Sequence, residues 1–227
     1  MKQNVSLFRK IRSWLIPVRI EQKTGELGHT VEVNLYKGKF MLDSEHANYS
    51  FGALESVFHH AFTVQGIYKE NLKHVLILGF GSGCTASLLA VHNNPEIYFT
   101  GVEADKVVIA LFHQYFRSSA PRHLELIHQD AAEFLKSCKQ QYDLILVDTF
   151  IDQQVPQHVT DETFISDIRQ ALTLNGKVLF NFIAQRTFDN EVAVLEKKFM
   201  NVFGNVTPTH SSIEGITNVV FCAQKKS

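Results

Sequence analysis

Hydrophobic and polar residues follow two successive patterns along this chain. In the first pattern, apolar side chains occupy every second position in three short runs, at residues 18–20, 31–35 and 40–42. Period two is typical of strands with one buried face, and Lys37-Gly38 indicates a turn between the last two runs. Residues 52–65 then change to helical spacing. We predict a small antiparallel β unit followed by a linking helix.

From residue 73 onward, short apolar runs alternate with segments of helical spacing. The clearest predicted helices span 106–116 and 161–172. Regular alternation of strands and helices favours a doubly wound parallel sheet. The predicted strands span 74–79, 97–103, 123–128, 142–148 and 176–183.

The last part of the chain departs from this alternation. A predicted helix at 189–201 precedes two strand-like runs, 205–213 and 217–223, which a Glu214-Gly215 turn joins. The expected fold class is α/β: a doubly wound, mostly parallel, seven-stranded Rossmann-like sheet that ends in an antiparallel pair. We divide the chain into an N-terminal extension with the small β unit and linking helix, residues 1–70, and a methyltransferase-like domain, residues 71–227.

A glycine-rich turn carries the first functional signal. The predicted strand at 74–79 runs into Gly79, Gly81, Ser82 and Gly83, and a helix-compatible segment follows. Glycines let backbone N–H groups approach a ligand, and a helix N-terminus favours anionic groups. The spacing is G-x-G-x-G because position 84 is Cys. This spacing favours an S-adenosylmethionine-type ligand, with a nicotinamide cofactor as a less favoured alternative.

Acidic residues end the next three apolar runs. Glu103 follows the second predicted strand, at the spacing at which a carboxylate contacts ribose hydroxyls. Asp130 and Asp148 end the two runs after that. The carboxyl ends of parallel strands meet at one edge of a sheet, so we expect all three side chains at one ligand site. The alternative for each is a helix cap.

Composition narrows the function classes. A formal net charge of −1 gives no electrostatic case for nucleic acid. The three cysteines and 11 histidines show no metal-ligand spacing, and the odd cysteine count favours a reducing, cytoplasmic location. No run reaches transmembrane length, so we expect no stable membrane insertion. The basic first 16 residues are interpreted as a frayed or docked terminal helix, with contact to a membrane or a partner as the alternative.

Several of these segments together resemble the spermidine synthase (polyamine aminopropyltransferase) family, which shares the methyltransferase fold. The similarity extends from about Ile20 to Gln224. The matching segments are Leu42-Asp43-Ser44, Glu55 to His59, Val75 to Thr85, Val102 to Asp105, Asp130 to Leu135, and Tyr142 to Asp148.

The resemblance implies a role for each matching residue. Gly79, Gly81 and Gly83 would pass under the ligand, and Glu103 with its neighbour Ala104 would lie at the ribose. Asp130 and the backbone of Ala131 would bind the adenine edge. Asp148 would be the general base that takes a proton from the attacking amine. Glu55, His59 and Asp152 are candidate substrate-binding residues, and a homodimer is the oligomer to test.

Departures from the family pattern change the expected chemistry. Ser82 replaces an aspartate, Ala53 a tyrosine and Ala47 a glutamine, while Asp152 comes four residues after Asp148 instead of three. The replaced groups hold a cationic amine, and a cation without carboxylate partners is costly to bind. Ser82 is compatible with the carboxylate of S-adenosylmethionine itself, which an aspartate would repel.

Three hypotheses follow. The first is an S-adenosylmethionine-dependent transferase that methylates a small-molecule acceptor. The second is an aminopropyltransferase that uses decarboxylated S-adenosylmethionine and has an altered amine pocket. The third is a nucleoside-binding protein without catalytic activity.

Overall fold

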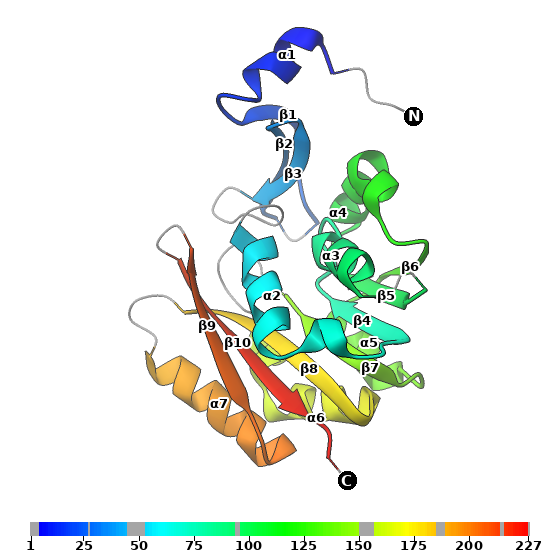
Figure 1. Cartoon of the computed structure of the whole chain (residues 1–227), viewed down its shortest axis with the longest axis vertical. Helices are drawn as coiled ribbons and strands as arrows, with labels where there is room; N and C mark the ends of the chain where they lie inside the picture. Colours follow the sequence, from blue (N-terminus) through cyan, green and yellow to red (C-terminus); the bar gives the residue numbers. More distant parts are fainter. Residues whose placement is uncertain are drawn as a thin grey trace.

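The protein is an α/β structure with a large and a small sheet. The computed structural model describes residues 5–26, 28–44, 53–93, 96–149, 157–184, 189–213 and 216–226. Figure 1 shows its elements in chain order. The strands are β1 (Val18–Thr24), β2 (Thr30–Tyr36), β3 (Lys39–Ser44), β4 (His74–Leu78), β5 (Tyr98–Glu103), β6 (His123–His128), β7 (Tyr142–Val147), β8 (Leu172–Ala184), β9 (Thr207–Ile213) and β10 (Ile216–Gln224). The helices are α1 (Leu7–Arg12), α2 (Ala53–Val64), α3 (Cys84–His92), α4 (Lys106–Leu111), α5 (Ala131–Ser137), α6 (Glu162–Ala171) and α7 (Asp189–Phe203), and the short helical turns are η1 (Ile67–Lys69), η2 (Phe112–Phe116), η3 (Arg117–Ser119) and η4 (Gln157–Thr160).

The large sheet has seven strands in the order β6-β5-β4-β7-β8-β10-β9. The first five are parallel, and β10 is antiparallel to both β8 and β9. This confirms the predicted doubly wound sheet with a closing antiparallel pair. The chain winds outward in both directions from β4 and β7, so their carboxyl ends form the switch point where open sheets bind ligands.

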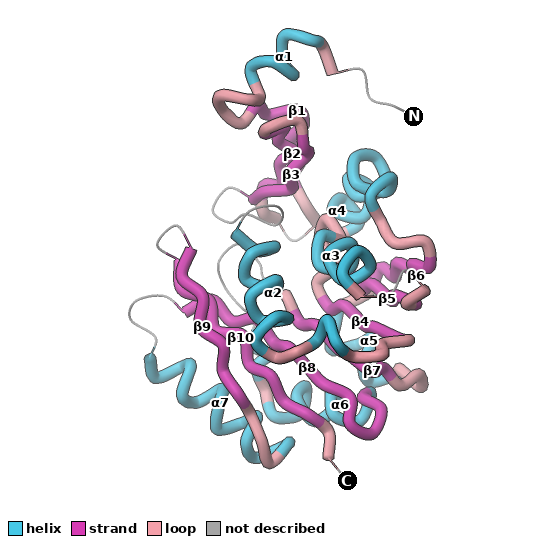
Figure 2. Tube along the Cα trace, viewed as in Figure 1, coloured by secondary structure: helices cyan, strands magenta, loops and turns pink. Residues whose placement is uncertain are grey.

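Alternate residues of the central strands enter two different cores. Val75, Ile77 and Leu146 face a core shared with α2, α3 and α4. Leu76 and Ile145 face the opposite core, shared with α5, α6 and α7. Figure 2 shows α2 and α3 in front of the sheet and α6 behind it. Burial on both faces explains why these strands are nearly continuous apolar runs in the sequence.

The small sheet, β1-β2-β3, is antiparallel throughout, as predicted. Its inward residues Val31, Val33 and Leu42 join the same core as Phe58 of α2 and Val75 of β4. The small sheet thus depends on the large one for burial. The division of the chain at residue 70 stays a prediction. The elements on the two sides of this boundary share one hydrophobic core.

The β1–β2 turn fastens the small sheet to the large one. Glu26 accepts a hydrogen bond from the Lys106 backbone N–H at the start of α4, with an N···O distance of 3.1 Å. It also lies 3.4 Å from the ring nitrogen of His128 at the end of β6. An anion at a helix N-terminus is favourable. The turn therefore sits at the carboxyl edge of the large sheet.

Two predicted elements differ from the structure. The helix expected at 106–116 is α-helical only to Leu111, and η2 continues it as a π-helical turn. This turn buries Phe112, Tyr115 and Phe116 together, which explains the change in winding. Strand β8 begins at Leu172, four residues before the prediction, with a register shift opposite β7. Within the described ranges no helix is long and apolar enough to cross a bilayer.

Candidate functional site at the carboxyl ends of the central strands

Backbone hydrogen bonds bring three strand ends together. The N–H groups of Gly79 and Phe80 both donate to the carbonyl of Val102, at 3.0 and 3.1 Å. The Asp148 N–H donates to the carbonyl of Leu78 at 2.8 Å. The glycine turn after β4 is thus held against the ends of β5 and β7, beside the switch point of the sheet.

A cavity of about 170 Å³ opens at this point. Seven of the predicted site residues line it: Gly79, Gly81, Glu103, Ala104, Asp130, Ala131 and Asp148. The three acidic residues predicted from separate strand ends therefore share one cavity. Its apolar wall includes Leu54, Phe80, Val102, Val108 and Val159, and a mostly apolar wall with a few polar groups is typical of a small-molecule site.

Glu103 anchors the glycine turn. Its carboxylate accepts hydrogen bonds from the Gly81 N–H at 2.9 Å and from the Asp105 N–H at 3.1 Å. Burial raises the pKa of Glu103, and these two backbone donors oppose the shift. Each oxygen retains a lone pair after these bonds. The carboxylate can therefore hold the loop and still accept hydrogen bonds from the hydroxyls of a sugar.

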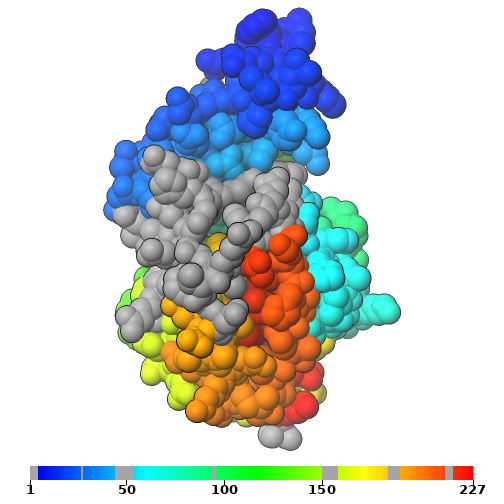
Figure 3. Space-filling model, turned by 90° about the vertical axis from the view of Figure 1, so that its left-hand side faces the viewer, coloured from blue at the N-terminus to red at the C-terminus, as the bar shows by residue number. Residues whose placement is uncertain are grey.

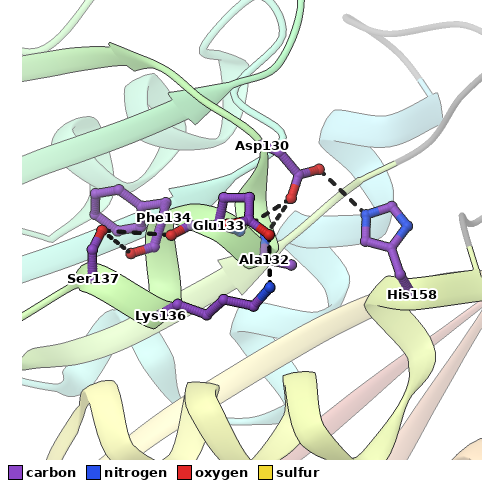
Figure 4. A network of polar contacts seen from close by, with 7 residues as sticks. All are labelled: Asp130, Ala132, Glu133, Phe134, Lys136, Ser137 and His158. Carbon is purple, nitrogen blue, oxygen red and sulfur yellow. Dashed lines mark hydrogen bonds and ion pairs between the residues drawn. The ribbon is translucent and has the colours of Figure 1, made fainter.

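Asp130 is both a helix cap and a cavity residue (Figure 4). One carboxylate oxygen accepts hydrogen bonds from the N–H groups of Ala132 and Glu133 at 2.9 and 3.1 Å. The other oxygen lies 3.3 Å from the ring nitrogen of His158. The capping interpretation is correct for the first oxygen. The second oxygen pairs with an exposed histidine that a ligand could displace.

Asp148 is a buried carboxyl of the cavity with a strongly raised pKa. Burial raises its pKa from 3.8 to about 7, the Asn181 side chain opposes this, and the charge of Glu103 adds to it. The amide of Asn181 donates to the carboxylate at 2.9 Å. A carboxyl with this pKa can accept and release a proton near neutral pH.

Ser82 and Glu55 lie together in a second cavity rather than in the first. This cavity is bounded by α2, α3 and the η2–η3 segment. Cys84 lines both cavities and so marks where they adjoin. Ser82 is thus absent from the lining of the cavity that Glu103, Asp130 and Asp148 share, and its role in cofactor binding stays a prediction. The same arrangement places the Glu55 carboxylate in the cavity that holds Ser82.

The remaining candidates have other positions. Gly83 caps the start of α3, and the position of its absent Cβ is 2.7 Å from the Phe80 ring, so it makes room for that ring. The exposed His59 ring lies against Tyr68 and His92 and is no part of the lining of either cavity in the described chain. Asp152 falls outside the described residues. Where the structure can be described, no three metal-binding side chains cluster.

Cys84 begins α3 directly after the glycine turn, and its surroundings disfavour the thiolate. Burial raises the pKa of its thiol to about 12, and the charges of Asp148 and Glu55 add to this effect. A thiol in this state is a poor nucleophile at neutral pH. Its place between the two cavities gives it a packing role.

Sequence reasoning missed two histidines of the first cavity. His29 enters it from the β1–β2 turn and lies 3.9 Å from the carboxylate of Asp105. No local pattern links His29 to residues more than 70 positions later. His158 enters the cavity from η4, the short helical turn between β7 and α6.

Gly79 should be far less tolerant of substitution than a glycine of similar conformation elsewhere. At Gly79 φ is +81°, and an added Cβ would lie 2.3 Å from the Asp148 carbonyl oxygen. We expect Gly79→Ala to lower the free energy of unfolding by about 2–4 kcal/mol. Gly204 is the matched control, since its φ is +72° but nothing lies within 4 Å. Gly204→Ala should cost about 1 kcal/mol. Equal losses in urea denaturation would contradict the close packing at Gly79.

Comparison with known proteins decides the family. The profile of the spermine/spermidine synthase domain matches residues 55–226. The chain belongs to this family. The matched region contains every predicted cavity residue from Glu55 onward, and His29 lies outside it.

Sequence relatives of this family member include two kinds of transferase. A polyamine aminopropyltransferase of Vibrio vulnificus is 29% identical over 150 residues, which cover 64% of this chain and 50% of that protein. A Drosophila pseudoobscura pseudoobscura protein named eEF1A lysine and N-terminal methyltransferase homolog is 26% identical over 176 residues, which cover 72% of this chain and 25% of that protein. The matched region thus spans at most half of either relative.

A solved structure confirms the fold of the family. The spermidine synthase from Thermotoga maritima superposes with a TM-score of 0.74 at 17% identity, and the match covers 91% of this chain and 72% of that one. At this identity the likeness concerns the architecture alone.

Proposed function

We propose that this chain is a transferase that binds the nucleoside of decarboxylated S-adenosylmethionine in the first cavity and transfers its aminopropyl group to an amine. The observation that carries the proposal is the convergence of Glu103, Asp130 and Asp148 in one cavity of a spermine/spermidine synthase domain. The residues fit such a nucleoside. Gly79 and Gly81 line the cavity without side chains, while Glu103 and Asp130 retain acceptor oxygens for sugar hydroxyls and an amino group.

Asp148 is the proposed general base. A donor of this class supplies an electrophilic carbon next to a positively charged sulfur. The Asp148 carboxylate would take the proton of the attacking ammonium and stabilise nearby positive charge. Asn181 orients this carboxylate with its 2.9 Å hydrogen bond and is itself buried.

Glu55 supports aminopropyl transfer over the methyl transfer that the sequence analysis favoured. That preference rested on Ser82, because no carboxylate was expected near the tail of the donor. The structure brings Glu55 into the cavity of Ser82, next to Cys84 and hence next to the nucleoside cavity. A carboxylate there can pair with the ammonium of an aminopropyl tail. The family match and the Vibrio relative point the same way.

The donor and the products test this proposal directly. We expect turnover with decarboxylated S-adenosylmethionine and a diamine to yield methylthioadenosine and an acceptor heavier by one aminopropyl group, as read by mass spectrometry. Glu55→Gln should raise KM for this donor by roughly 10-fold or more because it removes the charge that pairs with the tail. Ser56→Ala, an exposed neighbour on α2, is the control. An unchanged KM in the Glu55 variant would remove Glu55 from the donor site.

Methyl transfer remains the second candidate, and two observations favour it. Ser82 stands where the family has an aspartate, and the Drosophila relative is named as a methyltransferase. If S-adenosylmethionine is the donor, the products will be S-adenosylhomocysteine and a methylated acceptor. The same mass measurement therefore separates the two activities.

A further inference from the structure

The N-terminal segment carries a concentrated patch of exposed apolar side chains. Leu15 and Leu7 are 81% and 74% exposed, and Trp14 is 65% exposed. Large apolar side chains gathered on a surface mark an interaction site more often than scattered ones do. The N-terminal patch consists of Leu7, Phe8, Ile11, Trp14, Leu15 and Ile16, which are six of the 12 exposed large apolar residues in the described part of the chain.

The patch is held in place at one end of the molecule. Ser13 is fully buried, its hydroxyl donates to the carbonyl of Lys10 at 2.6 Å, and its own carbonyl accepts a hydrogen bond from the Lys37 N–H at 2.8 Å. Helix α1 therefore rests on the β2–β3 turn instead of covering a core. Figures 1 and 3 show it at the far end of the long axis, beyond the small sheet. The segment is thus a docked terminal helix, one of the forms expected from the sequence, and Ser13 rather than the apolar face makes the contact.

Basic residues flank the patch. The first 20 residues contain five of the 22 lysines and arginines of the chain and none of its 23 acidic residues. Within α1, Leu7 and Ile11 lie one turn apart on one face, and Lys10 and Arg12 fall on either side of it. An apolar face with basic flanks and a tryptophan is typical of segments that lie in the interface of an anionic bilayer.

The charge pattern decides between a lipid surface and a second copy of the chain. Two copies that meet through this patch would bring the same basic residues together, which is unfavourable. An anionic surface offers the opposite charge to these residues, and its acyl region can receive the apolar side chains. We propose that the N-terminal patch docks the protein reversibly on an anionic lipid surface.

Trp14 allows a direct test because it is the only tryptophan of the chain. The probe is a vesicle of phosphatidylcholine with about 30% phosphatidylglycerol, compared with phosphatidylcholine alone. We expect a saturable blue shift of Trp14 emission and co-sedimentation with the anionic vesicles only. Both should weaken at about 0.5 M salt, because screening reduces the attraction between basic residues and headgroups.

Two sets of variants separate the contributions. Phe8→Ser with Leu15→Ser should lower the partition coefficient by roughly 10-fold or more. Arg9→Gln, Lys10→Gln and Arg12→Gln together should remove the preference for anionic vesicles. The matched control is Leu174→Ser with Val194→Ser, which changes exposed apolar residues elsewhere and should bind like the parent. All these side chains are exposed, and circular dichroism will confirm that each variant is folded.

Two outcomes would overturn the proposal. One is the absence of both the blue shift and co-sedimentation with anionic vesicles. The other is a blue shift without lipid that grows with protein concentration, accompanies a dimer in analytical ultracentrifugation, and disappears in Phe8→Ser with Leu15→Ser. The second result would show that another copy of the chain covers the patch.

Discussion

Asp148→Asn is expected to lower kcat by about 10³-fold or more while methylthioadenosine binds as tightly as to the parent. The asparagine has the same shape and can still accept the hydrogen bond from Asn181, but it cannot take a proton. Turnover needs the ionised Asp148, whose pKa is about 7 in the free protein. We therefore expect kcat/KM of the parent to rise with pH through about 7, and this limb to be absent from the residual activity of the variant.

Stability provides an independent check on the same carboxyl. Between pH 4 and 7 the folded protein holds a proton on Asp148 that the unfolded chain has released, because burial raises the pKa from 3.8 to about 7. The folded state thus loses stability as pH rises through this window. Asp148→Asn removes this loss, so the stability of the variant relative to the parent should rise between pH 5 and 8, by at most about 3 kcal/mol.

The melting temperatures of parent and variant, measured by calorimetry at pH 5 and pH 8, give this difference in stability. Asp143→Asn is the control variant. Asp143 lies on β7, which ends just before Asp148, and its carboxylate accepts hydrogen bonds from the N–H groups of Lys73 and His74 at 2.8 and 3.0 Å. It should therefore lose stability on the same change. Full activity of Asp148→Asn would exclude the general-base role.

Glu103→Ala is expected to weaken nucleoside binding by about 100-fold or more, measured with methylthioadenosine by titration calorimetry. Two effects add. The variant loses the acceptors proposed for the ribose hydroxyls, and the N–H groups of Gly81 and Asp105 lose their partner. A site that hydrogen-bonds hydroxyl groups loses affinity steeply when its own polar groups are removed.

The control variants separate these two effects. Glu103→Gln keeps one carbonyl acceptor and should bind more tightly than the alanine variant. Glu133→Ala removes an exposed acidic side chain of α5 that pairs with Lys136, near the cavity but outside its lining, and should bind like the parent. If Glu103→Ala binds as well as the parent, the nucleoside lies elsewhere.

The sequence was most informative about the central strands. Val75 to Leu78 and Leu144 to Val147 are buried on both faces, so each appears as one uninterrupted apolar run whose end is easy to place. Acids at or just after the ends of parallel strands reach a common cavity because these strands end at one edge. Glu103, Asp130 and Asp148 were predictable for this reason.

Residues whose position depends on packing between elements were not predictable. The direction of the Ser82 side chain is set by the turn around Phe80, which packs into the space left by Gly83 and Gly101. The position of His29 at the first cavity depends on how the β1–β2 turn packs against the large sheet. The π-helical turn η2 buries three aromatic rings together. The spacing of these aromatic residues in the sequence is that of an ordinary α-helix, so the sequence does not reveal the π-helical turn.

The β1–β2 turn has a consequence for how the protein folds. Glu26 accepts a hydrogen bond from the start of α4, a Cβ at Gly25 would meet the Asp105 carboxylate, and His29 lines the first cavity. A molecule in that cavity touches groups from the first 30 residues and from the ends of β5, β6 and β7. It would act as a non-covalent cross-link between the beginning and the middle of the chain. Ligand binding and the cooperativity of unfolding would then both depend on the equilibrium between the folded and the unfolded protein.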